Sequence, residues 1–135
     1  MSAMDRPHPA PGPLEQPFWD WCRAGELRIQ RCAGCGAWRH LPRPRCPQCG
    51  GADLSWEKVC GRGVVWSFTI CHAPVLPAFA GAVPYNAVVV RLEEGVFLVS
   101  NLIDCANEDI TVGMDVEAVL VRVDDELTIP QFRPV

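Results

Sequence analysis

Apolar and polar residues follow two different patterns along this chain of 135 residues. From residue 52 onward, short runs rich in Val, Ile, Phe, Trp and Thr are separated by turn signals, which is typical of strands. Glu94-Gly95 and Asp124-Asp125 separate adjacent runs as hairpin turns would. Five or so short strands in about 80 residues predict a small closed barrel or a sandwich. The predicted strands are 52–60, 64–72, 84–94, 96–103, 115–124 and 126–132.

The segment upstream follows a helical pattern over residues 14–25. Phe18, Trp21 and Cys22 stand at i, i+3 and i+4 and share one face, and Gly25 supplies a stop. A helix this short is marginal alone in water, so its aromatic face must pack on something. That partner is either its own domain or another chain, which makes Phe18, Trp19 and Trp21 candidate interface residues. Four prolines in residues 1–13 predict a flexible or extended tail.

Four of the eight cysteines form the pattern C-x2-C-x10-C-x2-C, at Cys32, Cys35, Cys46 and Cys49. The N-terminus has no apolar signal segment, and eight cysteines without an export signal point to metal or catalysis rather than disulfides. Four thiolates suit a closed, structural Zn²⁺ site, and metal binding would stabilise a block with few apolar residues. Iron in a rubredoxin-like site, exchanging dithiols and structural disulfides are the alternatives. His40 lies within the loop but is not expected to bind the metal.

The remaining four cysteines show no ligand spacing, and their apolar or strand-like surroundings predict core positions. They are Cys22, Cys60, Cys71 and Cys105.

Charge divides the chain in two. Residues 1–62 carry nine Lys or Arg against six Asp or Glu, whereas residues 63–135 carry three against ten. The acidic second part argues against broad nucleic-acid binding. Eleven of the twelve basic residues are Arg, whose planar fork suits phosphate, although a solvated basic loop explains them equally well.

The sequence offers little for catalysis. No G-x-S-x-G, phosphate-loop or H-E-x-x-H motif occurs, and Glu93-Glu94 reads as a solvated turn rather than a catalytic carboxylate pair. Gly61-Arg62-Gly63 reads as a turn too short to cradle phosphate. Apolar runs are far too short for a membrane span, so a cytoplasmic binding or assembly module is expected.

Several motifs together are typical of one protein family. The aromatic helix PFWDWCRAGEL leads into IQRCAGCG, and HLPRPRC, PQCGG and the G-x-G-x-V-x-S-F-T segment at 61–69 follow. Over residues 14–135 the chain resembles the family of zinc-ribbon/OB-fold proteins associated with acyl-CoA metabolism, long catalogued as a domain of unknown function. The resemblance implies a mainly β fold in three parts: a Pro-rich tail and helix (1–26), a rubredoxin-like zinc ribbon (27–54) and an OB-fold barrel (55–135).

The resemblance also implies a function. Members of the family are non-catalytic subunits that bind thiolase-like, aldolase or acyl-CoA hydratase enzymes and scaffold them or help to enclose the acyl-CoA. We therefore expect a hetero-oligomer with one structural zinc per chain. CoA phosphates would suit bidentate arginines near the ribbon; the candidates are Arg39, Arg43, Arg45 and Arg62. The alternative is a single-stranded nucleic-acid binder, because OB-folds commonly present aromatic residues to bases.

Overall fold

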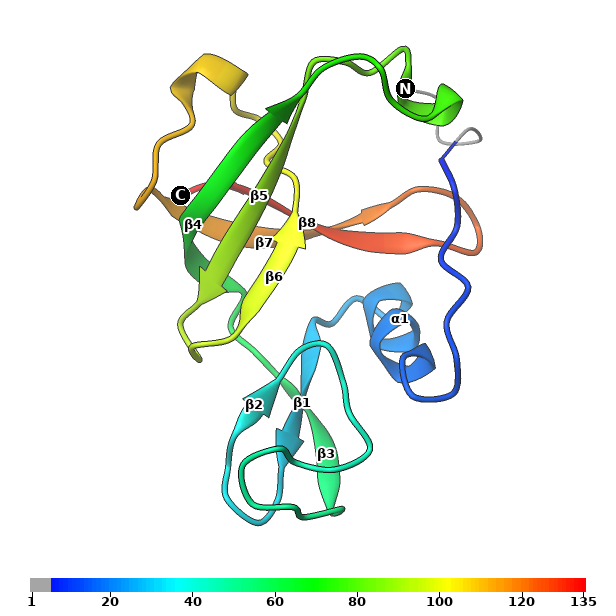
Figure 1. The fold of residues 1–135 in the computed structure, drawn as a ribbon, viewed down its shortest axis with the longest axis vertical. Helices are drawn as coiled ribbons and strands as arrows, with labels where there is room; N and C mark the ends of the chain where they lie inside the picture. Colours follow the sequence, from blue (N-terminus) through cyan, green and yellow to red (C-terminus); the bar gives the residue numbers. More distant parts are fainter. Residues whose placement is uncertain (1–5) are drawn as a thin grey trace.

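The computed structural model describes residues 6–135, which form one α-helix and two antiparallel sheets. In Figure 1 the three-stranded sheet lies at the bottom, the five-stranded sheet lies at the top, and α1 lies to the right between them. The helix and the first sheet come from the N-terminal part, and the second sheet from residues 62–134. The elements in chain order are α1 (Gln16–Arg23), β1 (Arg28–Cys32), β2 (Trp38–Arg39), β3 (Leu54–Lys58), β4 (Arg62–Cys71), the short 3-10 helix η2 (Pro77–Phe79), β5 (Tyr85–Leu92), β6 (Phe97–Ser100), the 3-10 helix η3 (Asn107–Asp109), β7 (Asp115–Arg122) and β8 (Thr128–Pro134).

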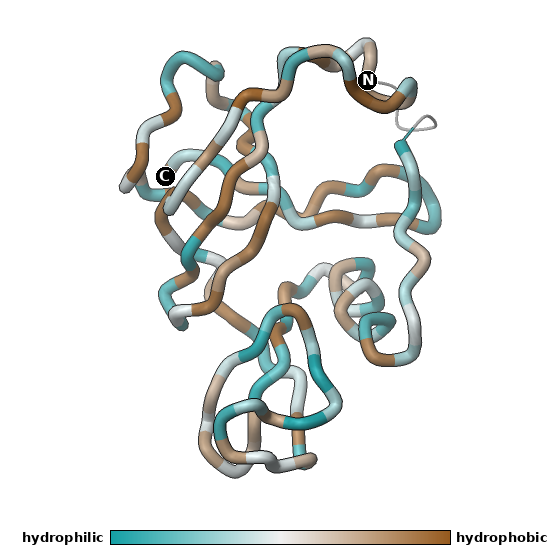
Figure 2. The backbone as a smooth tube through the Cα atoms, in the orientation of Figure 1, coloured by the Kyte–Doolittle hydropathy of each residue, from teal (hydrophilic) through white to brown (hydrophobic). Residues whose placement is uncertain are grey.

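The smaller sheet is a three-stranded ribbon of order β2-β1-β3. β1 is central and pairs over its whole length with β3, whereas β2 contributes only two residues. The long connection between β2 and β3 carries the second cysteine pair, whereas Cys32 is the last residue of β1 and Cys35 follows in the loop before β2. Figure 2 shows that the ribbon is mainly teal, white or pale brown, in keeping with its lack of a large apolar core.

The larger sheet has the order β6-β5-β4-β7-β8 and curls into a half-barrel. A bulge between Val65 and Ser67 interrupts the register of β4 with β5, and such bulges increase strand bending. The two edge strands approach where Leu102, after β6, forms a parallel bridge with Phe132 of β8. The mainly β prediction with an OB-fold barrel is thus confirmed, and the closure is made by a bridge rather than by a full ladder.

One apolar core joins the half-barrel to α1 and to the start of β1. Phe132 and Leu92 are almost completely buried, and Phe18 and Cys22 of α1 belong to the same cluster as Ile29 of β1. Burying each such side chain contributes about 1.5–3 kcal/mol. Of the two alternatives for the helix, packing on its own domain is the one observed. The helix is shorter than predicted and has Pro17 in its first turn, a position that needs no amide donor.

Gly63 corrects one prediction about local structure. It lies inside β4 rather than in a turn, and its backbone approaches β5 closely. A Cβ atom at this position would stand 2.4 Å from the carbonyl oxygen of Arg91. The absence of a side chain therefore lets two strands meet.

The predicted hairpins are confirmed. Gly95, with a φ of 90°, turns β5 into β6, and the Asp124 carboxylate accepts the amides of Glu126 and Leu127 at 2.8 and 2.9 Å between β7 and β8. Residues 6–13 of the predicted tail run beside this second turn in Figure 1, where His8 Nε2 lies 2.6 Å from Asp124. Residues 1–5 of the tail lie outside the described part of the chain.

Among residues 6–135 there is no helix with the length and apolar character needed to cross a membrane.

Candidate metal centre

Both cysteine pairs lie in tight turns that make the same backbone hydrogen bonds. The amide of Gly36 donates to the carbonyl of Cys32 at 2.9 Å, and the amide of Gly50 donates to the carbonyl of Cys46 at 2.8 Å. These glycines have φ values of 77° and 76°, a region that other residues rarely adopt. Each C-x-x-C-G segment therefore folds into a knuckle that turns its two thiols toward the other pair.

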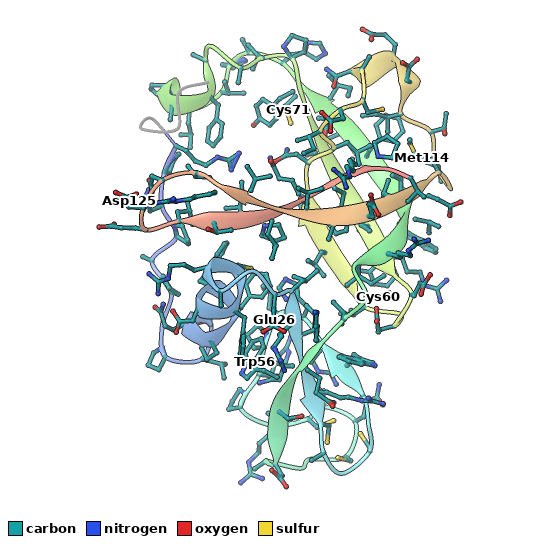
Figure 3. All side chains as sticks on the ribbon, turned by 180° about the vertical axis from the view of Figure 1, so that it is seen from behind. Glu26, Trp56, Cys60, Cys71, Met114 and Asp125 are labelled. Carbon is teal, nitrogen blue, oxygen red and sulfur yellow. The ribbon has the colours of Figure 1, made fainter. Side chains whose placement is uncertain are left out.

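The four Sγ atoms lie within 4.8 Å of one another. Cys32 is 3.5 Å from Cys49, and Cys35 is 3.6 Å from Cys46. A tetrahedral metal with sulfur ligands at about 2.3 Å places them about 3.8 Å apart, whereas a disulfide needs about 2.05 Å. The cluster thus fits one four-coordinate ion and leaves no ligand position for water or substrate. In Figure 3 sulfur atoms gather at the end of the ribbon farthest from the barrel.

Hydrogen bonds prepare these thiols unequally for metal binding. The backbone amides of Cys49 and Gln48 donate to Cys46 and lower its pKa to about 6, and amide hydrogen bonds, first from Cys35, also lower the pKa of Cys32. The Gly51 amide lowers the pKa of Cys49, but the neighbouring thiols and burial outweigh it and raise that pKa to about 11. The thiolate form is therefore favoured at Cys46 and Cys32 relative to Cys49. A bound metal would neutralise the repulsion that four neighbouring thiolates create.

Arginines support the knuckles. The guanidinium of Arg39 lies 3.8 Å from the sulfur of Cys46, and that of Arg45 donates to the carbonyl of Gly50 at 3.1 Å. Arg31 donates to the carbonyl of Gly36 at 3.0 Å. A four-thiolate zinc site carries net negative charge, so a guanidinium beside it is favourable.

The four arginines predicted to contact phosphate do not form one site. Arg39 and Arg45 are used at the knuckles, and Arg43 contributes its amide to the side chain of Gln30 at 2.8 Å. Arg62 begins β4, where it and Arg91 line a cavity of about 410 Å³. A contact with CoA stays a prediction for these residues.

The aromatic helix requires one correction. Phe18 is only 6% exposed, packs at 5.1 Å against His40 and belongs to the chain's own core, so it is not free for a partner. Trp19 and Trp21 are partly exposed, and the guanidinium of Arg28 covers the Trp21 ring at 4.1 Å. A partner contact by these two tryptophans stays a prediction.

His40 lies outside the sulfur cluster, as expected. Burial lowers its pKa, which keeps the ring neutral, and its Nδ1 atom is buried without a hydrogen-bond partner in the described structure. The ring lines a cavity of about 260 Å³ between α1, the ribbon loop and the half-barrel.

Sequence reasoning did not single out two aromatic residues that lie on the surface of the half-barrel. Trp66 and Phe97 are 56% and 40% exposed and pack edge to face with ring centroids 5.4 Å apart. The signal was present in residues 96–99, since Val96 and Leu98 alternate with Phe97 and Val99. All four are apolar, so alternation in chemistry could not tell the inner face from the outer one.

The core prediction for the other cysteines holds fully only for Cys22, whose thiol is buried with a pKa raised to about 12. For Cys60 the prediction is wrong, because this residue is exposed at the passage from the ribbon to β4 (Figure 3). Its thiol donates to Glu93 at 3.3 Å, and its amide donates to Glu94. Burial and these carboxylates raise its pKa, so it is not an activated nucleophile.

Comparison with known proteins extends this description. Residues 19–55 match the family model "ChsH2, rubredoxin-like zinc ribbon domain", and residues 56–121 match "ChsH2, C-terminal OB-fold domain". Together with the sulfur geometry, the first match identifies the cysteine cluster as a zinc site. Its closed shell makes the zinc structural.

Three similar proteins illustrate these matches. The ChsH2(DUF35) chain of a solved structure named "Ltp2-ChsH2(DUF35) aldolase" is 39% identical with a TM-score of 0.87, over 94% of this chain and 98% of that one. A DUF35 domain-containing scaffold protein of Methanocaldococcus jannaschii is 34% identical over 71% of this chain and 68% of that protein. A probable enoyl-CoA hydratase alpha subunit of Thermomonospora curvata is 42% identical over 96% of this chain, but the match spans only 40% of that subunit.

Proposed function

This chain belongs to the DUF35 family, as a zinc-ribbon and OB-fold protein of the ChsH2 type, and we propose from this that it is a non-catalytic accessory subunit of an acyl-CoA-processing enzyme. The observation that carries the proposal is the match over nearly the whole length of both chains to the ChsH2(DUF35) component of an aldolase. The relatives named scaffold proteins support the same role.

Three partner classes were expected: thiolase-like enzymes, aldolases and hydratases. An aldolase partner is favoured here, because the chain corresponds to 98% of the ChsH2(DUF35) chain but to only 40% and 34% of two hydratase alpha subunits. The proposed complex is a hetero-oligomer in which this chain supplies a rigid scaffold and the partner supplies the catalytic groups.

The chemistry of the described residues supports a scaffold. The zinc has four protein ligands and therefore cannot activate water, and the exposed thiol of Cys60 is held protonated. If the chain also contacts CoA, Arg43 and Arg62 are the better candidates, since Arg39 and Arg45 already bond to the knuckles.

Co-expression with the Ltp2 component named in the solved aldolase tests this function. We expect the tagged chain and Ltp2 to elute together from a sizing column, and acyl-CoA cleavage to require Ltp2. Separate elution, or turnover of acyl-CoA by the isolated chain, would falsify the proposal. The matched control is the chain with Cys46→Ser, whose ribbon cannot close.

The alternative of single-stranded nucleic-acid binding has one favourable feature, the Trp66–Phe97 pair on the outer face of the sheet. The turn between β7 and β8, which carries Asp124, Asp125 and Glu126, opposes it because three carboxylates repel phosphates. Titration with single-stranded oligonucleotides at physiological salt is therefore expected to show no binding tighter than micromolar.

A further inference from the structure

The edge strand β6 presents two apolar side chains to solvent. Val96 and Leu98 point into the core, with 7% and 2% exposure, whereas Phe97 and Val99 are 40% and 77% exposed. Trp66 of β4 packs against Phe97 from the same outer face. We call Trp66, Phe97 and Val99 the outer strip. Contiguous exposed apolar groups of this kind mark interaction sites on soluble proteins.

The same strand has unpaired backbone groups. β6 is an edge strand of the five-stranded sheet. The amide of Leu92 donates to the carbonyl of Val96, so hydrogen-bonded and non-hydrogen-bonded pairs alternate from that point along the β5–β6 ladder. By that alternation Phe97 and Val99 direct their amides and carbonyls away from β5. Neither makes a further backbone hydrogen bond within residues 6–135.

Edge strands usually carry protection against pairing with other chains, most often a lysine, a proline or an inward-pointing charge. Residues 95–103 contain no charged residue and no proline. The open edge of β6 is thus chemically suited to accept another strand.

The apolar surface continues toward the ribbon. Leu98 and Val99 line the 260 Å³ cavity together with Trp19 and Leu41, and Leu41 is 70% exposed. An occupant of the β6 edge could therefore place one apolar side chain in this cavity and contact ribbon and half-barrel at once.

Charges around the strip exclude a second copy as the best occupant. An antiparallel pairing of two β6 strands centred on Leu98 would set Glu93 and Glu94 of one copy beside Asp104 of the other. The like charges would repel. Arg91, which is paired with Phe97 in the β5–β6 ladder, is a basic group beside the strip, but residues 63–135 as a whole carry ten acidic against three basic residues. A complementary occupant has apolar residues at its centre and Lys or Arg at its ends.

We propose that the outer strip and the open edge of β6 bind an extended segment of the partner enzyme, with apolar side chains flanked by basic residues, as an added strand. This inference rests on the proposed function and deepens it, because it names the surface that holds the partner. Main-chain hydrogen bonds would give affinity, and Trp66, Phe97 and the cavity would give specificity.

The test compares Val99→Glu with Val112→Glu in binding to purified Ltp2. Val112 is a matched control, since it is also an exposed valine, at 66%, but lies in the loop before β7. We expect Val99→Glu to weaken binding at least about tenfold and Val112→Glu to leave it unchanged. Val99→Pro removes the outward-pointing amide without changing the charge of the side chain, and it is expected to weaken binding as well. Zinc content and circular dichroism show that each variant is folded.

The outcomes separate the two proposals. If the wild-type chain binds Ltp2 and Val99→Glu binds as tightly as Val112→Glu, the surface is wrong while the proposed function stands. If the wild-type chain does not bind Ltp2, both the proposed function and the binding of a partner segment at β6 are wrong. Sedimentation of the isolated chain and titration with an oligothymidine complete the experiment. Self-association that Val99→Glu abolishes would assign the strip to a second copy and overturn the inference. Oligonucleotide binding that Val99→Glu abolishes would assign the strip to nucleic acid and overturn it as well.

Discussion

The knuckle end of the ribbon, residues 31–53, buries only Cys32, Pro42 and Cys46, whereas the half-barrel buries a continuous set of Val, Leu, Ile and Phe side chains. The knuckles instead contain positive-φ glycines, thiols and arginines that bond to backbone carbonyls. A segment of this size cannot repay its conformational entropy by apolar burial alone.

Metal is therefore needed at the knuckle end and not in the half-barrel. The half-barrel and α1 share one apolar core that can hold them without a cofactor, and the zinc stabilises only the part that this core does not reach.

The largest expected effect is from Cys46→Ser. Replacing one thiolate by a weak hydroxyl ligand should reduce zinc from one per chain to almost none and unfold the knuckle end, because structural zinc contributes about 10–16 kcal/mol of apparent binding free energy. Elemental analysis and hydrogen exchange measure both effects, and we expect exchange in β5 to stay protected. Cys22→Ser is the control: it makes the same chemical change in the apolar core and should retain zinc. Full zinc occupancy in Cys46→Ser would contradict the assignment.

Phe132→Ala tests the opposite end of the comparison. Phe132 is completely buried in the shared core, and truncating such a side chain costs about 3–5 kcal/mol. We expect urea unfolding of the half-barrel at a much lower midpoint while zinc content stays at one per chain at low denaturant. Loss of zinc together with the core would show that the two parts are one cooperative unit.

The sequence predicts the ribbon better than the barrel surface, for physical reasons. Four cysteines at fixed spacing admit few geometries, so Cys32, Cys35, Cys46 and Cys49 could be placed together from spacing alone. The alternation of β4, β5 and β6 predicts strands, but long-range register decides which face of an all-apolar strand is buried. The sequence alone therefore could not show that Trp66 and Phe97 lie on the outer face.

Two wrong predictions have the same origin. Cys60 was expected in the core because its neighbours are apolar, but it stands where the chain passes between ribbon and barrel and bonds to a distant turn. Gly63 was expected in a turn, since nothing local reveals that β5 crosses 2.4 Å from where its Cβ would be. Non-local contacts determine both positions.

Asn86→Ala should have a smaller effect that is confined to the half-barrel. Asn86 is 7% exposed, and its side chain accepts the Leu102 amide at 2.6 Å and donates to the Leu102 carbonyl at 3.0 Å, next to the bridge between the edges of the sheet. Leaving these buried backbone groups unpaired costs about 1–3 kcal/mol. Chemical denaturation measures the cost, with Gln16→Ala as a control that removes an exposed side-chain amide on α1, away from this cluster. Equal stability of Asn86→Ala and wild type would refute this clamp.

The smallest effect is expected from Asp124→Asn, at the turn of the half-barrel that most resembles a knuckle. In both places an anion accepts hydrogen bonds from backbone amides, but the turn needs no metal because one carboxylate suffices.

The Glu126 amide, and then His8, lower the pKa of Asp124 below its ordinary value of 3.8. A lowered pKa means that the carboxylate adds stability above about pH 4 and that this contribution disappears as the pH falls through the folded value. Asn can still accept the amides but carries no charge, so Asp124→Asn should lower the melting temperature slightly at pH 7 and by less as the pH falls below the ordinary value of 3.8. Asp125→Asn, which changes a neighbouring exposed carboxylate that does not accept these amides, is the control. A melting-temperature difference that stays the same from pH 7 to below pH 3.8 would show that charge plays no part in holding this turn, and that the resemblance to the thiolate knuckles is one of shape alone.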